Sequence, residues 1–246
     1  MKLILTGATG VAGLSIYRAA LADPAVTKVT LLLRRELPSW AVLPANAQEK
    51  TETIIHTDYA SYPSELATRL AQHDACIWAL GKASKGISEP DYTRLTYDYP
   101  MAFINAVKEV GAGTTRSKGE EFRMVYISGE MADPEQKSWQ MWARVKGRAE
   151  KDLTTFAQTN TGFATHIIRP GYFFPSKEYP ADRLNQRGSG ADCVDRIMSP
   201  VYSTLLPSLY TPIDTLGKIA VELAKGRFKD ITLVRNSTLR ELGSQL

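Results

Sequence analysis

Residues that bind metals or form disulfides are scarce in this chain of 246 residues. There are two cysteines, Cys76 and Cys193, and three histidines, His56, His73 and His166. The cysteines lie far apart and form no CxxC pair, and the histidines show no metal-ligand spacing. We therefore expect neither a metal site nor a disulfide framework.

Long apolar runs are also missing. No run approaches the roughly 18 apolar residues that a membrane-spanning helix needs. The apolar run at the amino terminus, Leu3-Ile4-Leu5, is too short for the core of a secretory signal peptide. From these two absences we expect a soluble intracellular protein, located in the cytoplasm and without a membrane partner.

The charge balance shows no block of one sign. There are 30 lysines and arginines against 26 acidic residues, which gives a net charge of +4. Because the basic residues are spread along the chain, we expect a solvated surface and an anionic ligand, and no nucleic acid. The apolar content of 43% and the charged content of 23% are ordinary for a globular protein. The length suits a single α/β domain over residues 1–246.

The first thirteen residues, MKLILTGATGVAG, carry the strongest signal that is present. Their apolar run predicts a buried strand, which a glycine-rich turn follows, and a helical pattern begins at Leu14. Glycine accepts positive φ and lets a pyrophosphate approach the backbone, and the helix that follows offers unpaired N–H groups to an anion. We assign the phosphates of a dinucleotide to Gly7, Ala8, Thr9, Gly10, Val11 and Gly13.

The second strand, Val29 to Leu33, ends in Arg34 and Arg35. In dinucleotide-binding folds this position carries an acidic residue for NAD or an arginine for the 2′-phosphate of NADP. The position is basic here, so we predict NADP(H) as the cofactor. Asp58 follows the third strand, where it either contacts the adenine or serves as a capping or solvated loop residue.

The next 115 positions or so alternate between strands and helices. Apolar strands are predicted at Ala75–Leu80, Arg123–Ser128 and Ala164–Arg169, and helices at Pro63–Gln72, Asp91–Val110 and Trp139–Phe156. Such alternation predicts a Rossmann-like α/β fold with a doubly wound parallel sheet. At the end of the fourth strand, Leu80 and Gly81 are expected beside the cofactor, because a small residue lets the backbone pass close to it.

The last third of the chain differs in composition from the part before it. Residues 1–171 form the expected cofactor-binding core, and residues 172–210 form a small substrate lid rich in proline and aromatic residues. Its aromatic residues either wall a pocket for a small-molecule substrate or belong to the core. Residues 211–246 return to the sheet through a helix at Ile213–Lys225 and a strand at Ile231–Val234.

Together these features resemble the short-chain dehydrogenase/reductase superfamily in its atypical or extended branch. The resemblance rests on the turn Thr6–Gly13, on Ser128 after the fifth strand, and on Arg169-Pro170-Gly171. Over nearly its whole length the chain also resembles the small NADPH-binding oxidoreductases related to the human HIV Tat-interactive protein. The stretches that carry this closer likeness are Tyr97-Asp98-Tyr99, Val145-Lys146-Gly147 with Glu150, and Leu239–Gly243.

The resemblance implies roles for individual residues. Ser128 is expected to hold a substrate carbonyl, Lys146 to bind the nicotinamide ribose, and Pro170 and Gly171 to belong to the cofactor site. It also allows a homodimer through the two long helices. The departure is Trp142, which stands four residues before Lys146, where the family has its catalytic tyrosine. An indole N–H donates a hydrogen bond but does not serve as an acid, so Trp142 orients an oxygen without protonating it.

Three hypotheses follow from this departure. The leading one is an NADP(H)-dependent oxidoreductase that acts on a small carbonyl or alcohol, with Glu130, Tyr172 or a water as the acid. The second is a sensor or partner-binding module that binds the cofactor without redox chemistry. The third is an enzyme of isomerisation, cyclisation or elimination, in which Ser128 and Trp142 orient the substrate.

Overall fold

The centre of the molecule is a parallel β-sheet. The computed structural model describes residues 1–114, 120–187, 195, 198–202 and 204–246. In this part of the chain the strands run in the order β3-β2-β1-β4-β5-β6-β7, and every neighbouring pair is parallel. Their bounds are β1 Lys2–Thr6, β2 Lys28–Leu33, β3 Thr51–Ile55, β4 Ala75–Trp78, β5 Phe122–Ile127, β6 Phe163–Arg169 and β7 Leu233–Arg235. The predicted doubly wound α/β fold is confirmed.

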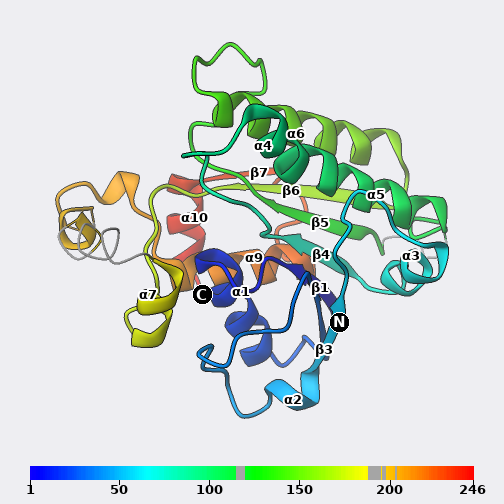
Figure 1. The fold of residues 1–246 in the computed structure, drawn as a ribbon, viewed down its shortest axis with the longest axis horizontal. Helices are drawn as coiled ribbons and strands as arrows, with labels where there is room; N and C mark the ends of the chain where they lie inside the picture. Colours follow the sequence, from blue (N-terminus) through cyan, green and yellow to red (C-terminus); the bar gives the residue numbers. More distant parts are fainter. Residues whose placement is uncertain (115–119, 188–194, 196–197, 203) are drawn as a thin grey trace.

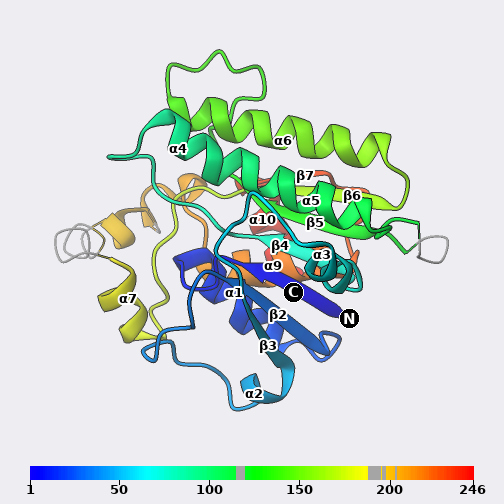
Figure 2. The same cartoon turned by 45° about the vertical axis from the view of Figure 1, so that its right-hand side comes forward.

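Helices cover both faces of the sheet (Figures 1 and 2). One face carries α3 Ser64–Ala71, α5 Tyr99–Glu109 and α6 Met141–Thr159, and the other carries α1 Val11–Ala22, α9 Ile213–Lys225 and α10 Asn236–Gly243. Strand residues alternate between the two cores: Ile4 packs toward α5 and α6, whereas Leu3 and Leu5 pack toward α1 and α9. Burial on both faces explains why the strands are apolar throughout.

The strand order reverses direction at β1. From β1 the chain first moves outward to β2 and β3, and then crosses back to β4 on the opposite side. In parallel sheets a ligand binds outside the carboxyl ends of the strands at such a reversal. The glycine-rich turn Gly7–Gly10 lies there, between β1 and α1. The backbone N–H of Leu80 donates to Thr6 Oγ1 at 3.2 Å and so ties the end of β4 to the end of β1.

The long helix expected at 91–110 is interrupted. It consists of α4 Glu89–Thr93, a π-helical turn Arg94–Asp98 and α5. The cause is Pro100, which has no N–H for the carbonyl of Thr96, four residues earlier. The buried hydroxyl of Tyr126 donates to that carbonyl at 2.9 Å instead. The structure also shows a short helix, α2 Ala47–Lys50, between β2 and β3.

The segment that follows β6 crosses the carboxyl ends of the strands. It contains α7 Pro180–Gln186 and a 3-10 turn at Pro207–Leu209. The buried side chains of Arg18 on α1 and Asp182 on α7 form a two-pronged ion pair, with nitrogen to oxygen distances of 2.5 and 2.9 Å. This pair fixes α7 beside α1 (Figure 1). Cys193 and part of the expected lid, at 188–194, 196–197 and 203, lie outside the described residues.

In the part of the chain that the structure describes, no helix has both the length and the apolar character that crossing a membrane requires. In the same ranges, no cluster of three or more histidine, cysteine or acidic side chains is arranged to hold a metal ion.

Candidate functional site

The glycines of the turn after β1 have different roles. Gly7 has φ +69°, and a Cβ there would lie 2.4 Å from the carbonyl oxygen of Ala79. A Cβ on Gly13 would lie 2.0 Å from the carbonyl oxygen of Gly7. These two glycines therefore let the turn pack against β4 and α1. Gly10 has no atom closer than 3.5 Å to such a Cβ, so this position is open to a ligand.

The amino terminus of α1 is suited to an anion. Its N-cap is Gly10, which offers no side-chain cap, and the first turn holds no acidic residue. The N–H groups of the first turn have no partner within the helix and carry the positive end of its dipole. Val11, Ala12 and Gly13 line the larger cavity described below. Ala8 instead points into the core under the turn and is fully buried.

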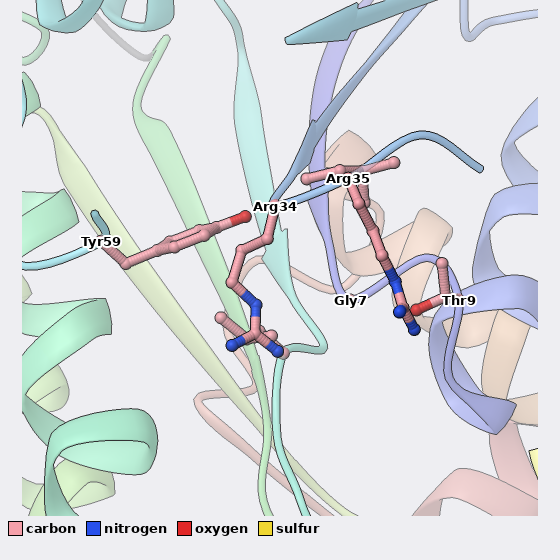
Figure 3. Close-up of a pocket in the computed structure, with 7 residues that line it drawn as sticks. Gly7, Thr9, Arg34, Arg35 and Tyr59 are labelled. Atoms are coloured by element: carbon pink, nitrogen blue, oxygen red, sulfur yellow. The ribbon is translucent and has the colours of Figure 1, made fainter. Parts of the chain in front are cut away.

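A cavity of about 380 Å³ lies on the β2 side of the turn. Figure 3 shows Arg34 beside the ring of Tyr59, and Arg35 extending toward Thr9. Both arginine side chains are exposed, and neither makes a hydrogen bond or an ion pair with any of the described residues. The lining consists of Gly7, Thr9, Leu33, Arg34, Arg35, Tyr59 and Leu80. Two unpaired positive charges therefore stand at the end of β2, as the sequence predicts.

The loop after β3 contributes Tyr59 to this cavity. The buried hydroxyl of Tyr59 donates to the carbonyl oxygen of Leu32 at 2.7 Å, and burial raises the pKa of Tyr59. Asp58 does not line the cavity: its Oδ1 accepts from the N–H of Ala60 at 3.1 Å, which places it in a turn. The structure therefore places Asp58 in the turn after β3. The aromatic residue next to Asp58 was the signal that sequence reasoning missed.

A second cavity, of about 610 Å³, brings the other predicted residues together. It lies between the start of α1, the ends of β4, β5 and β6, and the start of α6. From the phosphate turn and β4 it includes Gly10, Val11, Gly13, Leu80 and Gly81, and from β5, α6 and β6 it includes Ser128, Glu130, Trp142, Lys146, Pro170, Gly171 and Tyr172. Tyr92 and Tyr126 also line it, although the sequence analysis did not single them out.

Ser128 stands directly after β5. Its N–H donates to the carbonyl oxygen of Ile168 at 2.8 Å, which fixes the backbone, and its side chain is 4% exposed. The hydroxyl oxygen is buried and has no hydrogen-bond partner among the described residues. Buried polar atoms are almost always paired in folded proteins. A partnerless hydroxyl in the wall of a cavity is therefore available to a ligand.

Lys146 reaches the same place from α6. Its Nζ donates to the backbone carbonyl oxygen of Ser128 at 2.6 Å, and the side chain is half-buried. Burial lowers the pKa of Lys146 to about 8, and the carboxylate of Glu150 opposes this shift. Glu150 is itself buried and ion-paired with Arg169, whose Nε lies 3.0 Å from Oε1. Because the Glu150 carboxylate is already paired with Arg169, it stabilises the charged form of Lys146 only in part.

Trp142 lies one turn before Lys146 and also lines the cavity. A Cβ on Gly129 would lie 3.6 Å from Cζ3 of Trp142 and 3.9 Å from Nζ of Lys146. The indole therefore packs over the backbone that follows Ser128.

The two candidate acids differ in their surroundings. Both carboxylate oxygens of Glu130 are engaged: Oε1 accepts from Arg235 Nε at 2.8 Å, and Oε2 from the N–H of Asn236 at 2.9 Å. Glu130 thus caps the first turn of α10. Tyr172 is 61% exposed, and its ring stacks on Tyr202 with centroids 4.8 Å apart.

Comparison with known proteins gives no matching family model. Curated relatives named "Protein FMP52, mitochondrial" align over most of the chain. The Emericella nidulans protein is 28% identical over 89% of this chain and 85% of its own length, and the Candida albicans protein is 25% identical over both full lengths. These names contradict the cytoplasmic location that we expected from the sequence. The argument failed because it excluded only a secretory signal peptide and a membrane span, and neither is needed for a mitochondrial protein.

Solved structures share the fold at low sequence identity. An oxidoreductase of the short-chain dehydrogenase/reductase family from Burkholderia thailandensis has a TM-score of 0.67 at 15% identity, over 99% of this chain and 95% of its own. UDP-glucose-4-epimerase from Stenotrophomonas maltophila, solved with bound NAD, has a TM-score of 0.66 at 13% identity, over 96% of this chain and 76% of its own. The RhlG/NADP complex of Pseudomonas aeruginosa has a TM-score of 0.64 at 14% identity, over 97% of this chain and 96% of its own. The chain therefore has the fold of the short-chain dehydrogenases/reductases, an NAD(P)-binding oxidoreductase-like fold.

Proposed function

We propose that this protein is an NADP(H)-dependent oxidoreductase that reduces the carbonyl group of a small molecule. The observation that carries the proposal is the buried, partnerless hydroxyl of Ser128 in one cavity with Lys146 and the start of α1. A hydroxyl and an ammonium group beside an anion-binding helix terminus are the groups that a cofactor and a carbonyl oxygen require.

The residues present fit a dinucleotide. The open position at Gly10 and the uncapped start of α1 suit the pyrophosphate. Arg34 and Arg35 suit a 2′-phosphate, because neither guanidinium group has a partner among the described residues and both line the cavity beside the glycine turn. Pro170 and Gly171 border the opposite end of the larger cavity. When bound there, the nicotinamide supplies or accepts the hydride.

Ser128 and Trp142 position the substrate. The Ser128 hydroxyl donates a hydrogen bond to the carbonyl oxygen and stabilises the negative charge that develops on it. The indole N–H of Trp142 is a second donor at the same wall. Neither group gives up a proton at neutral pH, so the reduction needs a separate acid.

Lys146 is the acid that we propose. With a pKa of about 8, its ammonium form predominates at neutral pH, yet the group is acidic enough to give its proton to a developing alkoxide. The cavity is open to solvent, so the amine regains a proton from water. Glu130 is a weaker candidate because Arg235 and Asn236 occupy both of its oxygens. Tyr172 is weaker because its ring lies mostly in solvent.

A second function is favoured by one observation. Trp142 removes the acid that carbonyl reductases of this fold use, whereas isomerisation or elimination needs only oriented donors and a base, and the neutral form of Lys146 can serve as that base. In that case Ser128 and Trp142 hold the substrate, and no net change in the cofactor follows.

One experiment separates these functions. Calorimetric titration with NADPH and NADH measures cofactor binding, and the nicotinamide absorbance then reports turnover with a panel of aldehydes and ketones. We expect tight NADPH binding, oxidation of NADPH, and a loss of kcat in Ser128→Ala at unchanged cofactor Kd. Tight binding without oxidation favours the non-redox functions. No binding contradicts the assignment of the glycine turn.

A further inference from the structure

The wall of the larger cavity that faces away from the cofactor turn is mostly apolar. The hydroxyl of Tyr126 donates to the carbonyl of Thr96, so Tyr126 lines the cavity with its ring. Besides Lys146, the charged groups that line the cavity are Lys82, Glu130 and Arg187. Glu130 is held by Arg235 and the N–H of Asn236, and Nε of Arg187 lies 2.9 Å from the carboxylate of Asp195. The remaining wall residues beyond Ser128, Trp142 and Lys146 include Tyr92, Ile127, Met131, Tyr172, Phe173 and Leu209.

This apolar wall continues onto the protein surface. Met131 is 63% exposed, Tyr172 61% and Leu209 48%, although all three line the cavity. Leu205 and Leu206 are also exposed. Leu206 lies next to Leu209, because its carbonyl accepts the N–H of Leu209 at 3.0 Å. Exposed apolar patches that meet a cavity mark binding sites in soluble proteins. We call Met131, Tyr172 and Leu209 the apolar mouth.

Hydrogen bonds hold the apolar mouth in place. The N–H of Tyr172 donates to the carbonyl of Leu209 at 2.7 Å, and the ring of Tyr172 stacks on Tyr202. Asn236 connects the two sides: its N–H donates to Glu130, the neighbour of Met131, and its Nδ2 donates to the carbonyl of Ser208, the neighbour of Leu209. These hydrogen bonds fix the backbone on both sides of the entrance and so keep the three residues of the apolar mouth next to one another.

We propose that the substrate is an aliphatic aldehyde or ketone whose apolar chain runs from Ser128 through the apolar mouth to the surface. The carbonyl end of this assignment rests on the proposed function, whereas the chain end rests on the continuous apolar wall. A short polar substrate would leave Met131, Tyr172 and Leu209 in water. A longer chain covers them and gains the free energy of their burial.

Two measurements test the chain site. The first compares kcat/KM with NADPH for butanal, hexanal, octanal and decanal. We expect a rise of about fourfold for each added methylene, the factor that about 0.8 kcal/mol per buried CH₂ corresponds to. The second measures the Kd of the matching unreactive primary amides by calorimetry and does not depend on turnover.

Three variants locate the effect. Leu209→Asp and Met131→Asp place a charge in the mouth, and we expect each to weaken the binding of the longest amide at least tenfold. Leu184→Asp is the matched control, because Leu184 is 68% exposed on α7 and lines neither cavity. The wild-type Kd is expected there. Because the substituted side chains are exposed, thermal melts of all three should match the wild type.

The outcomes are distinct. Amide binding that strengthens with chain length and is lost in Leu209→Asp and Met131→Asp supports the chain site, even if no aldehyde is reduced; in that case the oxidoreductase function fails alone. Aldehyde reduction with a kcat/KM that does not depend on chain length overturns the chain site and leaves the oxidoreductase function standing. Amide binding that is independent of chain length, or equally weakened by Leu184→Asp, also overturns it.

Discussion

Removing the arginine pair at the end of β2 should change cofactor choice more than cofactor binding as such. In the double variant Arg34→Ala/Arg35→Ala the cavity of about 380 Å³ loses both guanidinium groups, while its backbone, Gly7, Thr9 and Tyr59 remain. The 2′-phosphate is the one group that distinguishes NADPH from NADH. We therefore expect a large loss of NADPH affinity and a small loss of NADH affinity.

The size of the loss follows from the surroundings of the two side chains. A hydrogen bond to a charged group contributes about 1.5 to 3 kcal/mol. Arg34 and Arg35 are exposed, so solvent screening favours the lower value for each. Two such contacts make about 3 kcal/mol, which is a rise of roughly 150-fold in the Kd for NADPH. NADH lacks the phosphate, and its Kd should change by less than about threefold.

Calorimetric titration of both cofactors measures these constants directly. The matched control is Lys151→Ala/Lys229→Ala, which also removes two positive charges, but from exposed positions that line neither cavity. It corrects for the long-range field of a chain with net charge +4. An equal loss for NADPH and NADH, or an equal loss in the control variant, would refute the phosphate-binding role of the arginine pair.

Three more predictions concern the larger cavity. Trp142→Tyr restores an acid beside Lys146, and we expect carbonyl reduction to appear or to rise by about 10²-fold or more; no gain with any carbonyl tested would point away from a disabled reductase. If Lys146 is the acid, kcat for reduction should fall about tenfold per pH unit above pH 8, because its lowered pKa of about 8 leaves it protonated only below that pH; a profile without this step in stopped-flow assays contradicts the role. Glu130→Gln should lower the free energy of unfolding by about 1 kcal/mol in urea titrations, through the lost cap of α10, and leave kcat near the wild-type value; a loss of kcat at unchanged stability would make Glu130 the acid.

Local patterns were sufficient for most of the fold. The apolar runs at β1, β2 and β4 and the glycine-rich turn predicted a parallel sheet because strands buried on both faces must be apolar throughout. The interruption of the helix at Arg94–Asp98 was missed, although Pro100 was visible in the sequence. A proline in the middle of a helix removes one backbone hydrogen bond. Only the tertiary structure shows that the hydroxyl of Tyr126 donates to the carbonyl of Thr96, and that the chain stays helical through a π turn.

The site residues divide in the same way. Ser128, Trp142 and Lys146 could be placed in one site from their spacing and their resemblance to a known family, and the structure brings them together in one cavity. Glu130 could not be assigned, because its partners Arg235 and Asn236 lie more than a hundred positions away in the sequence. Whether a carboxylate is a free acid or a helix cap depends on such distant neighbours.

The sequence alone determined the chemistry that is available: a turn that admits a phosphate, a basic strand end, and an indole in place of a phenol. These properties belong to single residues and short spacings, which do not change when the chain folds. Only the tertiary structure decided which of these groups are unpaired. Three features depend on what packs around them: the Ser128 hydroxyl, which has no partner among the described residues, the lowered pKa of Lys146, and the exposed mouth at Met131 and Leu209. Burial and hydrogen-bond partners come from segments far apart in the chain.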